Sequence, residues 1–225
     1  MQKLNVAELL DRLEAFHGPQ EVLWPIDPYE FLIWWHCGYP QSDAACARGW
    51  AALKQSVGTD AQRILAAPQS KLIAAMKAGG MVPEQRAAYL HEIARRVQDE
   101  FGGDLRAAVA GPVARARKLL KSFHSIADPG ADRILLFAQL IPTAAIPSNC
   151  PHVLVRIQAG PEGTNYGATY RDAQSLIEQN VPEQFHARQR AYLHLKQHGQ
   201  TICKRTPNCG ACPVRNNCAY ADKML

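Results

Sequence analysis

Four cysteines near the end of the chain have the spacing of a metal-ligand set. They occur within the segment CKRTPNCGACPVRNNC, with the spacing C-x5-C-x2-C-x5-C, and are Cys203, Cys209, Cys212 and Cys218. Structural zinc sites usually pair two short C-x2-C knuckles, whereas here one such knuckle lies between two wider intervals. The pattern therefore favours a [4Fe-4S] cluster. Zinc stays open as the first alternative, and a cluster that carries electrons as the second.

The other cysteines are isolated along the chain. The sequence of 225 residues has seven cysteines, an odd number, and the remaining three are Cys37, Cys46 and Cys150. No signal-peptide pattern and no run of 18 apolar residues is present. We therefore expect a soluble cytoplasmic protein of bacterial type with no membrane partner, in which these three thiols are buried and unpaired.

The charge is mildly basic. The formal net charge is +5 and the sequence pI is about 8.9, which is compatible with a nucleic-acid partner without being diagnostic of one. Three cations lie inside the cysteine segment (residues 203–218), namely Lys204, Arg205 and Arg215. Their position beside a metal loop makes them candidate phosphate contacts, whereas a solvated surface is the plainer interpretation.

The sequence predicts helices almost throughout and no strand. Asn5 and Glu8 form a capping-box pattern, and Asp27 followed by Pro28 marks the start of an apolar helix. Asp128 before Pro129 marks a similar start, with Asp128 as the expected N-cap. Further helices are expected over residues 44–55, 70–77, 83–101, 104–110, 112–123, 149–157, 170–179 and 183–199.

Three segments together resemble a known family. They are KSFHSIADPGADRILLFAQLIPTAAIPSN, NYGATYRDAQSLI and HGQTICKRTPNCGACPVRNNC. The chain from about Pro28 onward resembles the endonuclease III branch of the helix-hairpin-helix DNA glycosylase superfamily. The family's cysteine loop usually reads C-x6-C-x2-C-x5-C, so the first interval here is one residue shorter. The first segment aligns without a gap to the family pattern L-P-G-V-G-R-K-T-A followed by V-D-[ST]-[HN].

The resemblance implies an all-α, two-lobed fold. Residues 28–135 would form a six-helix lobe that ends in the helix-hairpin-helix. Residues 1–27 and 136–225 would form a second lobe, with a [4Fe-4S] cluster held by the four cysteines of residues 203–218. A monomer would bind double-stranded DNA, damaged or abasic, across the cleft between the lobes. Such a protein would associate with the nucleoid when bound to DNA.

Two positions depart from the family's catalytic pattern. The family uses a lysine as an amine nucleophile on the sugar and an aspartate that supports the cationic transition state. The gapless alignment places Pro129 and Pro147 at these positions, and the sequence has no lysine between Lys121 and Lys196. The polar candidates near the presumed cleft are His124, Asp128 and Asp132.

The hairpin also departs from the family. Ser125 and Ala127 stand where the family has glycines that let main-chain N–H groups approach a phosphate. Asp128, as an N-cap, would use the same amides and repel a phosphate, so we expect weakened binding of DNA by this segment. Phe123 and Ile126 still supply the apolar anchors.

A wedge residue is expected after the buried early helix. The family has a glutamine there that inserts into the DNA stack, and the nearest match is Tyr39 in HCGYPQSD. An aromatic ring could fill the gap left by a flipped base through stacking. A tyrosine in a helix-ending turn is the alternative.

Two hypotheses about function follow. The first is a base-excision-repair enzyme of the endonuclease III type, a DNA glycosylase with absent or weak AP-lyase activity. The second is a non-catalytic protein that binds lesions or DNA and retains the glycosylase fold. The prolines at 129 and 147 favour the second hypothesis.

Overall fold

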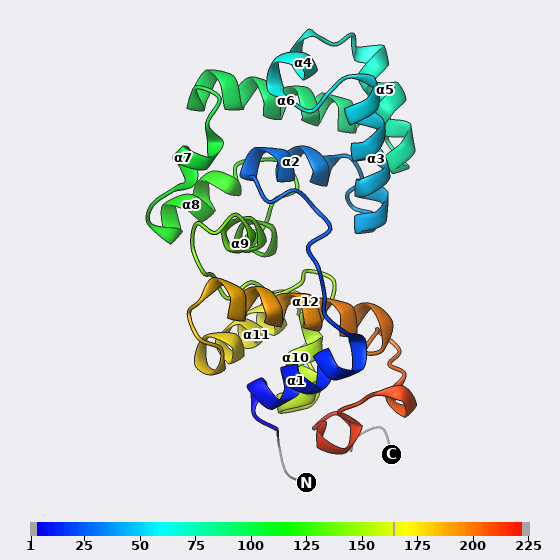
Figure 1. The fold of residues 1–225 in the computed structure, drawn as a ribbon, viewed down its shortest axis with the longest axis vertical. Helices are drawn as coiled ribbons and strands as arrows, with labels where there is room; N and C mark the ends of the chain where they lie inside the picture. Colours follow the sequence, from blue (N-terminus) through cyan, green and yellow to red (C-terminus); the bar gives the residue numbers. More distant parts are fainter. Residues whose placement is uncertain (1–3, 164, 222–225) are drawn as a thin grey trace. The chain divides into compact units, whose positions relative to one another are not determined.

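The computed structural model describes residues 4–163 and 165–221, and these residues form helices and turns without a strand. Figure 1 shows their arrangement. The predicted all-α class is therefore confirmed. The elements are α1 (Val6–His17), α2 (Pro28–His36), α3 (Asp43–Ser56), α4 (Ala61–Ala66), α5 (Gln69–Met76), η1 (Lys77–Gly79), α6 (Pro83–Phe101), α7 (Leu105–Val109), α8 (Val113–Leu120), α9 (Asp128–Phe137), α10 (His152–Ala159), α11 (Tyr166–Asn180), α12 (Phe185–Thr201), η2 (Cys209–Ala211) and η3 (Arg215–Asn217). No described helix is both long enough and apolar enough to cross a membrane.

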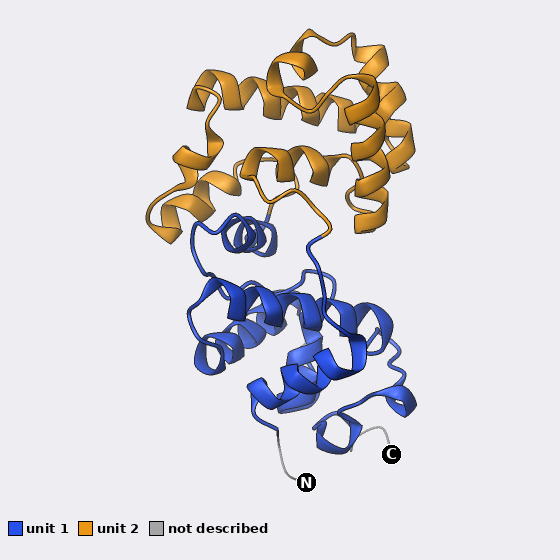
Figure 2. Cartoon of the chain, viewed as in Figure 1, with its two compact units in different colours: residues 1–22, 127–225 blue, residues 23–126 orange. Residues whose placement is uncertain are grey.

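The chain divides into two compact units (Figure 2). Unit 2 spans Leu23–Ile126, and unit 1 combines the residues before it with those from Ala127 onward. The resemblance implies lobe boundaries at residues 28 and 135, which would put most of α9 in the six-helix lobe. The structure instead assigns the whole of α9 to unit 1. The reason is the packing of α9 on α12: the rings of Phe137 and Tyr192 meet edge to face at 5.2 Å. The Gln189 side chain also donates to the main-chain oxygen of Leu136 at 3.0 Å.

Unit 2 is built around α2 and α6. The Asp27 carboxylate accepts hydrogen bonds from the N–H groups of Tyr29 and Glu30, as the N-cap pattern predicts. Nearly every residue of α2 is buried, which agrees with its apolar sequence. Helix α6 buries one stripe at helical spacing, with Leu90, Ile93 and Val97 among its members.

The core of unit 1 joins the start of the chain to its end. Leu9, Leu10 and Leu13 of α1 pack in one cluster with residues of α10, α11, α12 and the cysteine segment. The predicted capping box is present, because Asn5 and Glu8 each accept a hydrogen bond from the other's main-chain N–H.

Most of the predicted helices are present, with differences at some of their ends and with one α-helix that the sequence does not predict. The helix expected over residues 112–123 ends at Leu120, where a turn begins. Helix α11 begins earlier than predicted because Asn165 caps it, and α10 begins later, at His152. Helix α4 was not predicted, because six residues carry too little periodic signal to distinguish a helix from a turn.

Candidate functional site

The four cysteines line one small cavity in unit 1. The cavity has a volume of about 20 Å³, and residues of α10 and α12 form part of its walls. Cys203 and Cys218 are buried, Cys209 and Cys212 are half-buried, and all four are free thiols. The four cysteines that the spacing predicts as ligands thus lie around one cavity.

The chain reaches this arrangement through short turns. Cys203 follows α12, and its N–H donates to the main-chain oxygen of His198 at 2.8 Å. The two short helices η2 and η3 carry the chain past the cavity. The N–H of Ala219 then donates to the main-chain oxygen of Ile157 at 3.0 Å, which fastens the end of the segment to α10.

Burial favours the protonated form of two of the four thiols. Burial raises the pKa of Cys203 to about 11, against the opposing effect of Arg156. Burial also raises the pKa of Cys212, and the neighbouring Cys218 and Cys209 raise it further. A metal that binds here must therefore displace protons, which is usual for thiolate ligands.

The four cysteines offer soft sulfur donors of the type that iron–sulfur clusters and zinc prefer. In the described part of the chain, no three Cys, His, Asp or Glu side chains are grouped closely enough to hold a single metal ion. In a [4Fe-4S] cluster each thiolate binds a different iron, so the sulfur atoms stand farther apart than around one ion. The chemistry of the four sulfur donors fits such a cluster.

A buried arginine supports the cavity. Arg156 of α10 is 4% exposed, and its guanidinium pairs with both carboxylate oxygens of Glu162 at 2.7 and 2.6 Å. It also donates to the main-chain oxygen of Lys204 at 2.9 Å and lies over the ring of Tyr220. Its positive charge faces Cys203, which favours the thiolate form. Sequence reasoning missed Arg156, although a lone arginine in the apolar run HVLVRIQ is a usable signal.

Two histidines complete the surroundings of the cysteines. His198 is fully buried, with one ring nitrogen 3.7 Å from Cys212 Sγ and the other 3.1 Å from His17 Nε2. His152 contacts the main-chain oxygen of Cys203 at 2.8 Å through Nε2. These contacts connect α1, α10 and α12 to the cysteine segment.

The three predicted phosphate contacts lie at the surface of the cysteine segment. Lys204, Arg205 and Arg215 are all exposed. Lys204 directly follows a cysteine, and Arg215 begins η3. The conformation of the cysteine segment therefore sets the positions of these three positive charges.

The predicted hairpin turn (residues 122–126) has a glycine-like backbone at one position. Ser125 has φ +57°, in the left-handed region that glycine adopts without strain. A serine there costs roughly 1–2 kcal/mol. Phe123 and Ile126 are buried, as their predicted role as apolar anchors requires, whereas Ser125 and the following Ala127 are exposed.

The expected role of Asp128 as N-cap is wrong. The N–H of Ala131 donates to the main-chain oxygen of Ala127 at 3.0 Å, so Ala127 is the N-cap and α9 begins at Asp128. Pro129 is then the second helical residue, which its missing N–H also permits. The Asp128 carboxylate is exposed and adds negative charge to the first turn.

The catalytic candidate Asp132 is inside the protein. Its carboxylate is 0% exposed and accepts hydrogen bonds from the hydroxyl of Tyr170 at 3.0 Å and the amide of Gln174 at 2.8 Å. Its main-chain oxygen accepts from Thr143 Oγ1 at 2.8 Å. This carboxylate therefore joins α9 to α11 within unit 1. The third candidate, His124, lies exposed in the hairpin turn and pairs with Glu92.

Buried prolines occupy the two positions that the gapless alignment matches to catalytic residues. Pro129 belongs to α9, and Pro147 lies in a turn where its main-chain oxygen accepts a hydrogen bond from the N–H of Cys150 at 3.1 Å. Neither side chain can act as an acid, a base or a nucleophile.

Tyr39 lies in the loop between α2 and α3, and the loop that precedes α6 also exposes apolar side chains. It is 37% exposed, and its ring stacks on Trp35 at 4.5 Å. Gly80 of the other loop packs closely on the Gln41 side chain. Sequence reasoning missed the exposed residues that follow it, Met81 and Val82, 67% and 51% exposed. Two apolar residues between Gly-Gly and a helix-starting proline could have indicated them.

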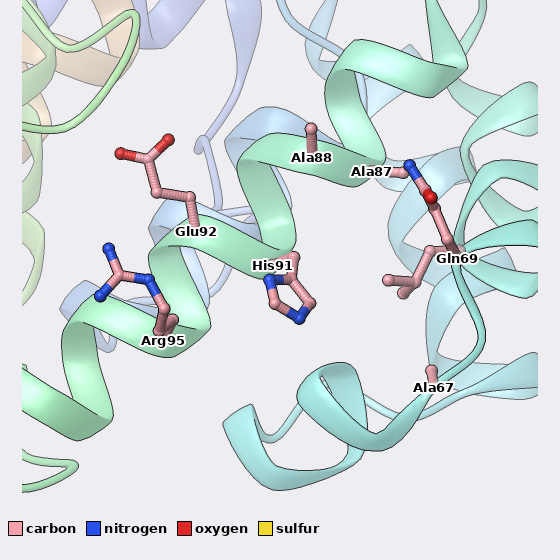
Figure 3. A pocket seen from close by; sticks show the side chains of 8 residues that line it. Ala67, Gln69, Ala87, Ala88, His91, Glu92 and Arg95 are labelled. Atoms are coloured by element: carbon pink, nitrogen blue, oxygen red, sulfur yellow. The ribbon is translucent and has the colours of Figure 1, made fainter.

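A separate pocket of about 390 Å³ lies against α6 in unit 2. Figure 3 shows that α6 contributes most of its lining, with Ala67 and Gln69 on the facing segment. Its lining contains no Phe, Tyr or Trp ring on which a base could stack. Glu92 lines this pocket and also pairs with His124 of the hairpin turn.

The fold of this chain is similar to solved structures of endonuclease III and of DNA glycosylases. A trapped covalent intermediate of endonuclease III with DNA is 17% identical, with a TM-score of 0.75 over 97% of this chain and 96% of that one. A thermostable thymine-DNA glycosylase is 22% identical, with a TM-score of 0.74 over 96% of each chain. The 3-methyladenine DNA glycosylase MagIII of H. pylori, bound to 1,N6-ethenoadenine, is 15% identical, with a TM-score of 0.66 over 88% of this chain and 98% of that one.

These likenesses establish the fold. At the level of sequence, the chain matches no protein-family model and no curated protein.

Proposed function

We propose that this chain, which has the fold of the DNA glycosylases, is a DNA-repair protein that binds damaged or abasic duplex DNA and lacks AP-lyase activity. The observation that carries the proposal is the contrast between its cysteine cavity and its catalytic positions. Four thiols converge beside buried Arg156, while Pro129 and Pro147 stand where the family has a nucleophile and an acid. The similar endonuclease III structures contain DNA, which supports a DNA partner.

The cysteine segment would hold a [4Fe-4S] cluster through Cys203, Cys209, Cys212 and Cys218. When bound, the cluster would supply four metal–thiolate bonds that fix the loop. Arg156 would offset the negative charge of the thiolates, and its bond to the main-chain oxygen of Lys204 would help to set the direction of the chain there. Lys204, Arg205 and Arg215 would then contact phosphates in a sequence-independent, salt-dependent way.

The exposed loops of unit 2 offer a second kind of contact. Tyr39, held by its stacking on Trp35, presents an aromatic face that can stack on a base. Met81 and Val82 are apolar side chains of the type that wedges between base steps. We further propose that the protein acts as a monomer in the cytoplasm, associated with the nucleoid when bound to DNA.

A glycosylase without lyase activity is the second candidate function. Exposed Asp128 and His124 are titratable groups near the substituted positions in sequence, and either could act as an acid or base. Fully buried Asp132 already accepts hydrogen bonds from Tyr170 and Gln174, which suits a structural role.

Two measurements test the proposal. Purified protein with its metal should retard a duplex that contains an abasic-site analogue more strongly than an undamaged duplex. A panel of damaged-base duplexes should show no base release above the uncatalysed rate. Equal, weak binding to both duplexes would contradict lesion binding, and base release at enzyme-like rates would favour the second candidate.

A further inference from the structure

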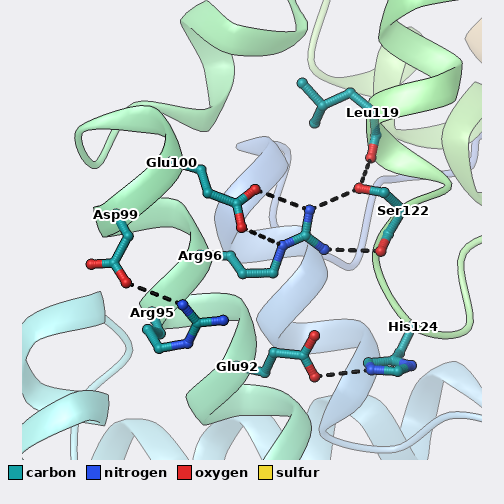
Figure 4. Close-up of polar contacts among 8 residues, drawn as sticks. All are labelled: Glu92, Arg95, Arg96, Asp99, Glu100, Leu119, Ser122 and His124. Carbon is teal, nitrogen blue, oxygen red and sulfur yellow. Dashed lines mark hydrogen bonds and ion pairs between the residues drawn. The ribbon is translucent and has the colours of Figure 1, made fainter.

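Helix α6 braces the hairpin turn through Arg96 (Figure 4). The guanidinium donates to the main-chain oxygen and to the hydroxyl of Ser122, both at 2.9 Å. Two further hydrogen bonds, at 3.0 and 3.2 Å, fix it to the carboxylate of Glu100. It also lies 4.3 Å from the ring centre of Phe123. Because the Arg96 side chain is only 14% exposed, this contact is more than a surface ion pair.

A second brace acts on the other end of the turn. Glu92 of α6 pairs with His124 Nε2 at 2.9 Å, and the His124 ring stacks on Tyr89 at 4.4 Å. His36 of α2 is buried and contacts the main-chain oxygen of His124 at 2.9 Å through its own ring nitrogen. The turn is thus held from α6 and α2 by side chains that lie outside it.

These braces explain how the turn keeps a costly backbone conformation. Ser125 adopts a left-handed backbone conformation, which costs more free energy for serine than for glycine because glycine has no Cβ atom. A strained residue persists when the surrounding structure determines its conformation. Here Arg96 fixes residues 122 and 123, and Glu92 with His36 fixes residue 124, directly before the strained position.

We infer that Glu92 and Arg96 are positioning residues that hold the main chain of the hairpin turn in the conformation that receives a DNA phosphate. The inference rests on the proposed function, because a phosphate can reach the turn in this way only if the protein binds DNA. Neither side chain needs to touch DNA for this role. In this chain the braces replace the conformational freedom that glycines would provide.

Glu92 gives a test in which two effects have opposite signs. Removal of a carboxylate makes the protein more basic, and electrostatics alone would then strengthen the binding of a polyanion. Loss of the brace should weaken it. We expect Glu92→Ala to bind a duplex with an abasic-site analogue roughly two- to fivefold more weakly, since an exposed pair contributes on this scale. Combination with Ser122→Ala, which changes no charge, should bring the loss to about tenfold.

Asp99→Ala is the matched control. Asp99 lies on the same helix and pairs with Arg95 at 3.2 Å, away from the turn, as Figure 4 also shows. This variant removes the same charge and should bind DNA as tightly as the wild type or slightly more tightly. Glu92→Gln keeps an acceptor for His124 while losing the charge, and it should retain wild-type affinity.

Two further readouts separate positioning from general destabilisation. The slope of log affinity against log salt reports the number of phosphate contacts, and its magnitude should fall by up to about 1 in the double variant. A globally destabilised protein should keep the wild-type slope. Amide hydrogen exchange of residues 122–126 should accelerate in Glu92→Ala and stay unchanged in Asp99→Ala. Wild-type protein that fails to bind DNA would refute the proposed function. Wild-type binding with Glu92→Ala as tight as Asp99→Ala would overturn the positioning role alone.

Discussion

The cysteine segment (residues 203–218) and the segment from the hairpin turn to Pro147 both carry the resemblance to the glycosylases, yet they differ in what they retain. In the first, four thiols line one cavity, and buried Arg156 lies beside them. In the second, both expected catalytic positions are buried prolines.

The difference shows that residues at the expected catalytic positions of this fold can serve its packing. Pro129 suits the first turn of α9, and Asp132 connects that helix to α11. Residues of the second region therefore stabilise unit 1, a role that does not depend on chemistry.

Cys203→Ser should have the largest effect. Loss of one ligand should release the cluster and with it on the order of 5 kcal/mol of folding free energy, because binding of a structural metal is coupled to folding. Iron analysis should fall from about four irons per chain to almost none, and the unfolding temperature should fall with it. Cys46→Ala, which alters a buried thiol of unit 2, should keep the full iron content. Stoichiometric zinc in the wild type would contradict the cluster.

Asp132→Ala should be the most damaging change in the second region. It leaves the buried Tyr170 hydroxyl and Gln174 amide without their shared acceptor, which costs about 2–4 kcal/mol. Urea unfolding of the variant measures this loss. Asp128→Ala, at an exposed site, should change stability by less than about 1 kcal/mol. A stable Asp132→Ala protein with altered base release would instead assign the carboxylate a catalytic role.

Glu162 should make stability depend on pH in the acid range. Its ion pair with Arg156 lowers its pKa to about 2, from an ordinary value of 4.5. The folded pKa is depressed, so the stabilisation is fully present above pH 4.5 and is lost as the pH falls toward 2. With partial exposure of the carboxylate, we expect Glu162→Gln to cost about 1–2 kcal/mol at neutral pH.

The free-energy difference between wild type and Glu162→Gln should therefore shrink as the pH falls from 4.5 to 2. Urea unfolding at several pH values in this range gives that difference directly. A free-energy difference that stays constant over this pH range would show that the Glu162–Arg156 ion pair is not the source of the stabilisation.

Lys204→Ala, Arg205→Ala and Arg215→Ala should have the smallest individual effects. Each should weaken DNA binding by about 1 kcal/mol or less, equally for all DNA sequences. Each should also lower the magnitude of the slope of log affinity against log salt by about 1, because one phosphate contact is lost. Arg63→Ala removes an exposed cation of unit 2 that pairs with Asp60, and it should leave the slope unchanged. An unchanged slope in all three variants would remove the cysteine segment from the DNA interface.

The sequence predicts those parts of the fold and site that depend on local pattern. Helical periodicity, the capping box at Asn5 and the spacing of the cysteines are local, and the structure confirms the helices and the capping box. The partners of Asp132 lie 38 and 42 residues away on another helix, so no local pattern indicates its burial. The same holds for Arg156, whose contact with the main-chain oxygen of Lys204 spans 48 residues.

The helix start at Asp128 shows how close two local patterns can be. An aspartate before a proline is a common N-cap signal, yet the hydrogen bond from Ala131 moves the cap to Ala127. The left-handed Ser125 was also not predictable, because serine has no intrinsic preference for that conformation and the braces on it come from α6 and α2.

Borohydride trapping on a duplex with an abasic site tests the central claim most directly. We expect the protein to retard the duplex but to form no covalent adduct and to leave the strand uncut, because no lysine stands at the aligned nucleophile position. A covalent adduct would contradict the loss of the nucleophile. A duplex that is neither bound nor trapped would contradict the retained binding surface.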